Sequence, residues 1–227
     1  NEDNFFDYEK GIYVAGKIGD DWRIANPSAT WDGGKPGNYK ERGIEWEREA
    51  HFEMFETDGT LMLSQNIGTR IHGGWSRSWY PKSIRMYARS DYDNTNAFEY
   101  PIFEGLEKRG HPGEPLTSFR RLILRGSGND YEYTYFRDAL MQELISHLSL
   151  DMQAYRPAVH FINGEYWGMT NIRERLDQHY LANHYEMDAD DAVILTGSGA
   201  SLDTGFETDR DHFLATVSYA QNNDPSQ

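Results

Sequence analysis

The chain has 227 residues, which suits one large domain or two small ones, with no cysteine and a formal net charge of −15. The missing cysteine excludes disulfides, thiolate nucleophiles and cysteine metal sites, and the acidic balance argues against nucleic-acid binding, which needs a basic surface. No apolar run is long enough to span a bilayer.

The first half of the chain is predicted to form short strands and loops. GIYVAG at 11–16 has the pattern of a short strand, and a Gly- and Pro-rich loop follows it. Two strands are predicted at Glu49–Phe55 and Leu61–Ile67, because an Asp-Gly pair between them is a good hairpin signal. A third strand is predicted at Lys82–Arg89.

The second half alternates strands and helices. A strand begins at Ser118 and ends in a turn at Asn129 and Asp130, which can cap the next helix. Arg156–Arg173 has the pattern of a hairpin with an Asn-Gly turn. We expect this hairpin to contribute to the core the side chains of Val159, Phe161, Trp167 and Met169. The other predicted elements are helices at Thr134–Leu150, Leu176–Tyr185 and Asp209–Gln221 and a strand at Ala192–Gly197. This order is typical of an α+β fold.

A basic stretch at 69–90 contrasts with the acidic chain, since it holds five Lys and Arg residues and no acid. It contains Gly73 and Gly74, whose N–H groups could face an anion. The alternative is a plain hairpin turn, and the spacing alone favours that reading because no Walker motif is present. Phosphate binding therefore remains one of two hypotheses for this stretch.

The phase of the strand at 82–89 separates its cations. Side chains alternate between the two faces of a strand, so Lys82 lies on the same face as Ile84 and Met86. Arg85 lies on the other face, which we expect to be solvated. Lys82 is therefore predicted to point inward, where its ammonium could meet a phosphate or extend to water.

The helix at 134–150 carries an apolar stripe with charges in or beside it. Glu143 lies at the edge of this stripe and Arg137 lies within it. Because a buried charge needs a partner, Glu143 could meet Lys82, or it could extend to solvent. Arg137 could pair with a carboxylate of a nearby loop. The reading in which Glu143 meets Lys82, and the structural reading in which Glu143 extends to solvent and Arg137 pairs with a loop carboxylate, both stay open.

Other patterns that carry chemistry are weak. The histidines show no HExxH motif or compact ligand spacing, and a calcium loop and a GxSxG elbow are absent, so no metal site is predicted. The NIRER segment at 171–175 places charges where a strand gives way to a helix. It is either a hinge or a solvated crossing.

Several long stretches together resemble a known family. They are GIYVAG, WERE-AHFEMF, GTRIHGGWSRSWYPKSIRMYAR, FRRLILRGSGND, TYFRDAL and YRPAVHFINGEYWGMTNIRERLDQHYL. In this order, from about Gly11 to about Leu195, they resemble the CotH family, the secreted atypical kinases of the spore-coat protein H type. The resemblance implies a protein-kinase-like small lobe: an antiparallel sheet with a flanking helix, followed by the beginning of a helical lobe. The implied divisions are an N-terminal strand and loop extension at 1–40, the small lobe at 41–175, and the hinge exit and first part of the helical lobe at 176–227.

The resemblance also implies an ATP site, with Mg²⁺ as cofactor of the complete protein. GGWSR would be the turn that covers the phosphates, and Lys82 would contact them. The implied nucleotide-binding residues are Gly73, Gly74, Ser76, Arg77, Lys82, Glu143, Arg173 and Glu174. The catalytic and metal-binding aspartates of such a kinase come from later motifs, which we expect beyond Gln227. The chain alone is therefore expected to hold no catalytic residue and to be inactive.

The implied partners are a nucleotide and a secreted or surface protein phosphorylated on Ser or Thr, as in bacterial spore coats. The implied location is outside the bacterial cell or on its surface, after removal of a signal peptide. An alternative is a non-catalytic surface module of the same fold, since the many Tyr and Trp residues suit contact with sugars or proteins. A two-carboxylate hydrolase is a third hypothesis, although no pair of acids is singled out by its context.

Overall fold

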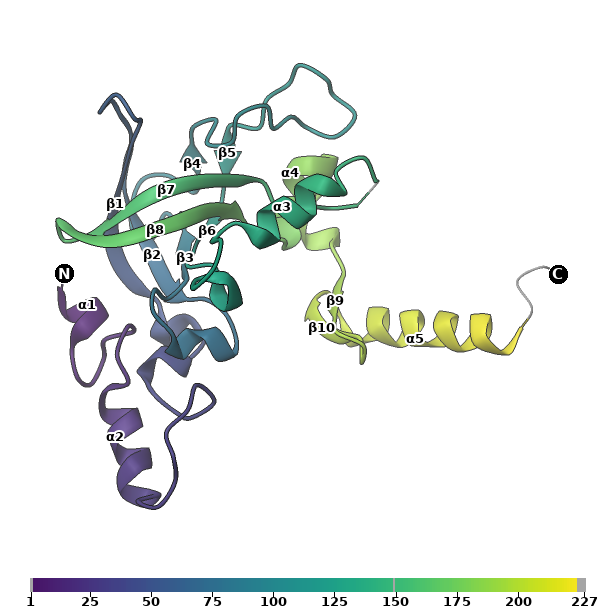
Figure 1. Ribbon diagram of the computed structural model, residues 1–227. Coiled ribbons are helices and arrows are strands. Elements are labelled where there is room, and N and C mark those ends of the chain that lie inside the picture. Colours follow the sequence, from purple (N-terminus) through teal and green to yellow (C-terminus); the bar gives the residue numbers. More distant parts are fainter. Residues whose placement is uncertain (1, 149, 224–227) are drawn as a thin grey trace. The chain divides into compact units, whose positions relative to one another are not determined.

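The computed structural model describes residues 2–148 and 150–223 and combines helices with antiparallel strands, as the sequence predicts (Figure 1). Contacts between Cα atoms divide the chain into two compact units. The first comprises Asn1–Leu106 and Pro115–Arg175, and the second comprises Glu107–Glu114 and Leu176–Gln227. None of the helices in the described residues is long and apolar enough to cross a membrane.

The first unit is built on a six-stranded sheet with the strand order β1-β2-β3-β6-β8-β7, in which neighbours run antiparallel. Its strands are β1 (Arg48–Phe55), β2 (Leu61–Ile71), β3 (Ile84–Tyr87), β6 (Arg121–Arg125), β7 (Tyr155–Ile162) and β8 (Glu165–Glu174). Both predicted hairpins are confirmed. The β7–β8 turn places Asn163 and Gly164 at φ of 53° and 82°, which this two-residue turn requires.

The other elements of the first unit are short. They are α1 (Glu2–Phe6), α2 (Gly16–Ala25), the strand pair β4 (Phe98–Glu99) and β5 (Ser118–Phe119), and α3 (Arg137–Leu144). The remaining helical turns are 3₁₀ helices at Asn38–Lys40, Ile44–Trp46, Trp75–Ser78 and Gly128–Asp130.

The predicted strand at 11–16 is wrong. The N–H groups of Ile12 and Tyr13 donate to backbone carbonyls of α1 at 3.1 and 2.8 Å, and α2 begins at Gly16. Both side chains are nevertheless buried, at 2% and 1% exposure. The two apolar side chains therefore do pack into the core, but the backbone that carries them forms a turn and is not part of a sheet.

The helix predicted at Thr134–Leu150 is confirmed only at Arg137–Leu144. Ser149 of the predicted span lies outside the described residues. The apolar stripe that motivated the prediction is largely exposed, at 45–60% for Phe136, Leu140, Leu144 and Leu148. The helix therefore does not bury this stripe in the described part of the chain.

The hydrophobic core lies on one face of the sheet. This core face carries Ile84 and Met86 of β3, Leu122 and Leu124 of β6 and Ile172 of β8. The N-terminal residues pack against the same cluster through Phe5, Ile12 and Tyr13. The first residues of the chain are therefore part of the unit that contains the sheet.

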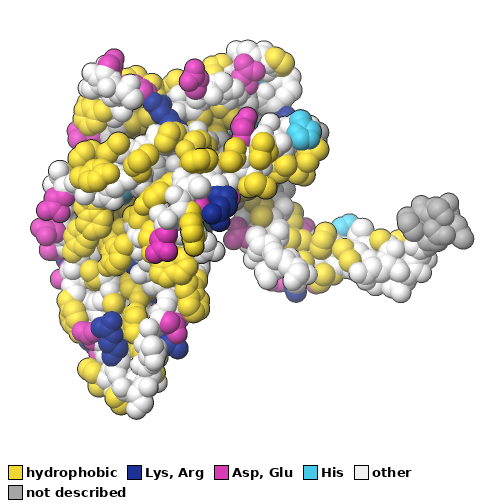
Figure 2. Space-filling view, in the orientation of Figure 1, with side chains coloured by type: hydrophobic (Ala, Val, Ile, Leu, Met, Phe, Trp, Pro, Cys, Tyr) yellow, Lys and Arg dark blue, Asp and Glu magenta, His cyan; other side chains and the backbone are white. Residues whose placement is uncertain are grey.

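The hairpin β7–β8 contributes less to the core than predicted. Trp167 is partly buried and its ring stacks on Phe6 with centroids 5.5 Å apart. The prediction is wrong for Val159, Phe161 and Met169, which are 60%, 57% and 51% exposed. These three side chains lie on the opposite face, where Figure 2 shows hydrophobic atoms over β7 and β8.

The second unit contains α4 (Gln178–Tyr185), a 3₁₀ turn at Ala189–Asp191, the hairpin strands β9 (Ile194–Thr196) and β10 (Ser201–Thr204), and α5 (Glu207–Asn222). The predicted helices and the first strand are confirmed within a few residues, whereas β10 was not predicted. The carboxylate of Asp177 caps α4, accepting from the N–H groups of His179 and Tyr180 at 2.9 and 3.2 Å.

Candidate functional site

The glycine turn, residues 72–83, joins β2 to β3. Gly73 has a φ of +111°, and a Cβ at this position would lie 2.6 Å from Oγ of Ser76. Gly74 has a φ of −107°, and a Cβ there would meet no atom within 4 Å. The backbone therefore requires glycine at position 73, whereas a Cβ at position 74 would meet open space.

Cations of the protein itself bind the carbonyl groups of the glycine turn. The carbonyl of Gly73 accepts from Nε of Arg77 at 2.8 Å, and that of Gly74 accepts from Nζ of Lys40 at 3.1 Å. Arg77 is 3% exposed, and its Nη1 donates to two carbonyls of the preceding loop at 3.1 and 2.8 Å. The resemblance implied that Arg77 contacts the nucleotide, whereas in the structure its side chain holds the glycine turn in place. Ser76 lies half-buried within the same turn.

Lys82 points inward, as predicted, and its side chain is enclosed. Its exposure is 1%, and Nζ donates to the carbonyls of Arg77 and Trp79 at 2.8 and 3.4 Å. The ring centroids near Nζ are those of Tyr39 and Tyr80 at 4.3 Å and Tyr13 at 5.5 Å. Burial lowers the pKa of Lys82 to about 7, and the charge of Lys40 acts in the same direction. The ammonium group therefore ties the glycine turn to the core.

The suggested contact between Glu143 and Lys82 is wrong. Glu143 is exposed on α3, and no ion pair joins it to Lys82 in the described residues. The strand phase explains this. Lys82 lies on the core face of the sheet, whereas α3 contacts the opposite face through Asp138. The alternative for Arg137 is confirmed, since its guanidinium lies 3.2 Å from the loop carboxylate of Asp130. That carboxylate also accepts from the N–H of Arg137 at 2.9 Å.

The sheet face opposite the core is rich in arginine. In the register, Arg70 pairs with Arg85, Arg85 with Ile123 and Ile123 with Arg173, so these residues share one face. We define the basic face by the arginines that lie on it or just beyond its strand ends: Arg70, Arg85, Arg89, Arg121, Arg125, Arg173 and Arg175. The chain is acidic as a whole, so this face concentrates its positive charge.

Tyr87 lies beneath several of these guanidinium groups. The groups over its ring, at 4.9, 5.0 and 5.6 Å from the centroid, belong to Arg70, Arg89 and Arg121. The side chain of Tyr87 is 3% exposed, and Ser83 on the same face is 7% exposed. The expectation that this face is solvated is therefore wrong for these two residues, because arginine side chains cover the tyrosine.

Two carboxylates neutralise part of the basic face. The buried Glu47 accepts from Nε of Arg70 and Nε of Arg89, each at 2.7 Å. Asp138 of α3 accepts from Nη1 of Arg173 at 2.7 Å and lies 3.7 Å from Nε of Arg125. The two acids are thus committed to four arginines, and positive charge remains.

Arg85 is held by a histidine. Its Nε donates to Nδ1 of His72 at 2.7 Å. Burial and, after it, the positive charges of Arg85, Arg125, Arg175 and Arg77 together lower the pKa of His72 to about 3. The imidazole is therefore neutral and accepts at Nδ1. Sequence reasoning placed Arg85 on the correct face but missed this pair, because the β2–β3 register that joins the two residues was unknown.

Arg173 and Glu174 lie at the end of β8, where they fasten the chain that enters β7. Arg173 is 1% exposed and donates to the carbonyls of Gln153 and Ala154 at 3.2 and 3.1 Å. Glu174 is 3% exposed, and its Oε2 accepts from the N–H of Ala154 at 3.1 Å. Both predicted site residues thus have clear structural contacts, and neither lies in the glycine turn.

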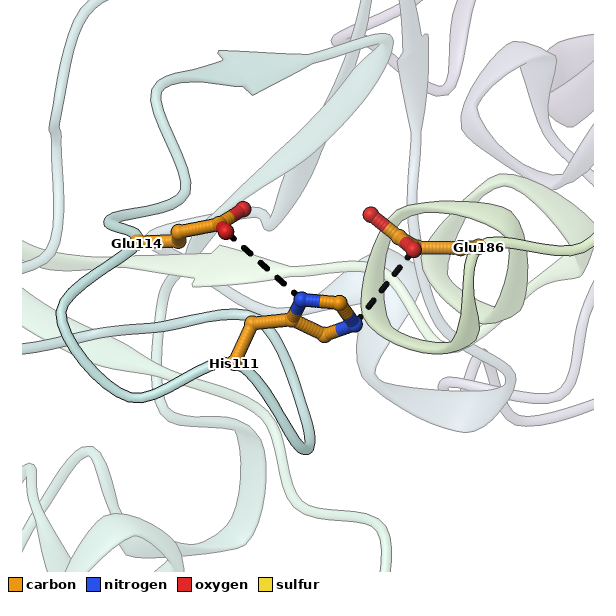
Figure 3. Close-up of side chains that lie close together, drawn as sticks. All are labelled: His111, Glu114 and Glu186. Atoms are coloured by element: carbon orange, nitrogen blue, oxygen red, sulfur yellow. Dashed lines mark ion pairs between the residues drawn. The ribbon is translucent and has the colours of Figure 1, made fainter.

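A separate cluster in the second unit brings together His111, Glu114 and Glu186. Figure 3 shows the two carboxylates facing the ring nitrogens of His111, at 3.6 Å from Nδ1 and 3.4 Å from Nε2. Their candidate ligand atoms lie within 4.8 Å of one another. Nζ of Lys108 lies 3.5 Å from Glu114 and 3.0 Å from Glu186, so a lysine already offsets part of the charge of the two carboxylates.

Residues 69–227, more than half of the chain, match a protein family described as CotH kinase protein. The chain belongs to this CotH family. The resemblance noted in the sequence is thereby confirmed at the level of the family. The CotH match begins at Thr69, so it contains the glycine turn, β3, α3 and the second unit. No curated protein matches the chain closely enough to add to this assignment.

Proposed function

We propose that this CotH-family chain binds ATP through its first unit, as part of an atypical kinase that phosphorylates Ser or Thr of surface or spore-coat-like proteins. The observation that carries the proposal is the basic face beside the glycine turn, in a protein of net charge −15. Arginine forks match phosphate oxygens in geometry and charge. Because the family is described as a kinase family, we propose a nucleotide as the ligand that carries the phosphates.

The arrangement of α3 and the sheet supports the proposal of a kinase-like small lobe. In protein kinases, an ion pair joins a sheet cation to a helix carboxylate beside the nucleotide. Here Asp138 of α3 pairs with Arg173 of β8 at 2.7 Å. We propose that the second unit corresponds to the hinge exit and the beginning of the helical lobe.

Among the described residues, the two acids that neutralise the basic face, Glu47 and Asp138, do not fit a Mg²⁺ site. This ion prefers carboxylate and water oxygens in octahedral geometry. Glu47 and Asp138 are both engaged with arginines, and the cluster at His111 contains an imidazole and a lysine. We therefore propose that the basic face binds the nucleotide without supplying a metal ligand of its own, and that ligands of a metal come from residues outside this face.

Calorimetry tests the proposed binding. ATP is expected to bind the purified chain, with an affinity that falls as salt is added because the phosphates meet arginines. Adenosine, which lacks phosphates, is the matched control and should bind much more weakly. Absence of binding at millimolar ATP, or equal binding of adenosine, would contradict the proposal.

A non-catalytic surface module is the second candidate. Its support is the apolar outer face of the β7–β8 hairpin, where the exposed side chains are Tyr155, Val159, Phe161, Tyr166 and Met169. Such a patch suits contact with a protein or a sugar. Binding to cell-wall polysaccharide or to a surface protein, in a chain that does not bind ATP, would favour this candidate. Under either function we propose an exported or cell-surface location, as the resemblance to secreted kinases implies.

A further inference from the structure

In the described part of the chain, the guanidinium group of Arg85 is bonded at Nε only. Its Nε is bonded to His72, and neither Nη atom has a hydrogen bond or ion pair within residues 2–148 and 150–223. The side chain is half-buried. Because the histidine holds one edge of the planar group, the two Nη atoms form an oriented fork of the kind that binds two phosphate oxygens.

Further cations flank Arg85 on the same face, since Arg125 lies two residues beyond Ile123, the register partner of Arg85, and Arg175 lies two residues beyond Arg173. Arg125 is only loosely paired, 3.7 Å from Asp138, and Nη1 of Arg175 donates to Oη of Tyr87 at 3.4 Å. Together with Arg85, these arginines act on the imidazole of His72. Like charges held close together at a half-buried surface repel one another, so a polyvalent anion would stabilise this arrangement.

Lys82 is a poor alternative for the same anion. It lies on the core face, it is 1% exposed, and its ammonium donates to two carbonyls within a group of tyrosine rings. To reach a phosphate it would have to break these contacts and leave the core.

We infer that the phosphate groups of the nucleotide bind to Arg85 and Arg125 on the basic face, and that Lys82 serves only to fix the glycine turn. This assignment deepens the proposed function and rests on it for the identity of the ligand. The site recognises a chain of phosphates. Inorganic tripolyphosphate should therefore also bind there.

Calorimetry with ATP and with sodium tripolyphosphate tests the assignment on the full chain. Arg85→Gln is expected to weaken both ligands about tenfold or more, since it removes charge-assisted hydrogen bonds. Arg120→Gln is the matched control, because Arg120 is exposed between β5 and β6 and not part of the basic face. It should leave both affinities unchanged. If Arg85→Gln does not fold, Arg125→Gln tests the same cluster and should also weaken both ligands.

The outcomes separate this inference from the proposed function. ATP binding that is equal in wild type and Arg85→Gln overturns the inference and leaves the function in place. Tripolyphosphate binding that depends on Arg85, without ATP binding, supports the anion site and overturns the function. Failure of the wild-type chain to bind either ligand overturns both.

Discussion

Lys82 and Arg85 lie close in the sequence but on opposite faces of the sheet. Lys82 is enclosed by tyrosine rings on the core face, whereas Arg85 donates to His72 on the basic face. The two cations therefore have different surroundings and different chemistry. One stabilises the glycine turn, and the other has no hydrogen bond or ion pair at its Nη atoms within the described residues.

Lys82→Met is predicted to change how stability depends on pH. The folded-state pKa of Lys82 is lowered to about 7, against about 10.4 in an unfolded chain, so between these values the unfolded state binds the extra proton. Wild-type stability should therefore rise with pH across this window. Relative to Lys82→Met, the gain from pH 7 to 9 should be about 2 kcal/mol. Urea unfolding of both proteins at several pH values measures it, and parallel curves would contradict the burial of the ammonium group.

His72 gives a prediction on the acid side. Its folded-state pKa is lowered to about 3 from 6.5, so the unfolded chain takes up a proton as the pH falls and stability is lost. The control is His72→Asn, which does not titrate and keeps an acceptor for Nε of Arg85. Between pH 7 and pH 5 the wild type should lose about 2 kcal/mol more than this variant. An NMR titration of His72 with a midpoint near 6.5 would contradict the prediction.

The two glycines of the turn should respond differently to alanine. Gly73→Ala puts a Cβ at a φ of +111° and close to Ser76, so it should destabilise the chain by about 1–3 kcal/mol. Gly74→Ala places its Cβ in open space at a negative φ, and should cost less than Gly73→Ala. Thermal or urea unfolding compares the two. Equal losses would show that the glycine turn has a different backbone conformation.

Glu47→Gln should destabilise the first unit strongly. The carboxylate is buried between Arg70 and Arg89, and removing its charge leaves two guanidinium groups without their counterion. Loss of such a buried pair costs about 3–5 kcal/mol. Glu49→Gln, at an exposed position of β1, is the control and should have a small effect. Similar unfolding midpoints for the two variants would contradict the assigned role of Glu47.

The sequence predicts the local elements well where turn chemistry is strong. The Asn-Gly pair at 163–164 and the alternation around Lys82 both gave correct results, because they depend only on neighbouring residues. Ile12 and Tyr13 misled the prediction, since a buried apolar pair has the same pattern in a turn as in a strand.

The candidate site depends on which strands pair and in which register, and local sequence patterns do not reveal this. Arg85 meets His72 only because β2 and β3 pair in one register, and Asp138 identifies the face that α3 contacts. The phase argument put Lys82 inside correctly, but it could not show that tyrosine rings surround its ammonium group there.

The most direct test is a comparison of ATP dissociation constants for Arg85→Gln and Lys82→Met, each shown to be folded by circular dichroism. The proposed site predicts that Arg85→Gln weakens ATP binding about tenfold or more, whereas Lys82→Met binds ATP as the wild type does. Loss of ATP binding in Lys82→Met with full binding in Arg85→Gln would contradict it.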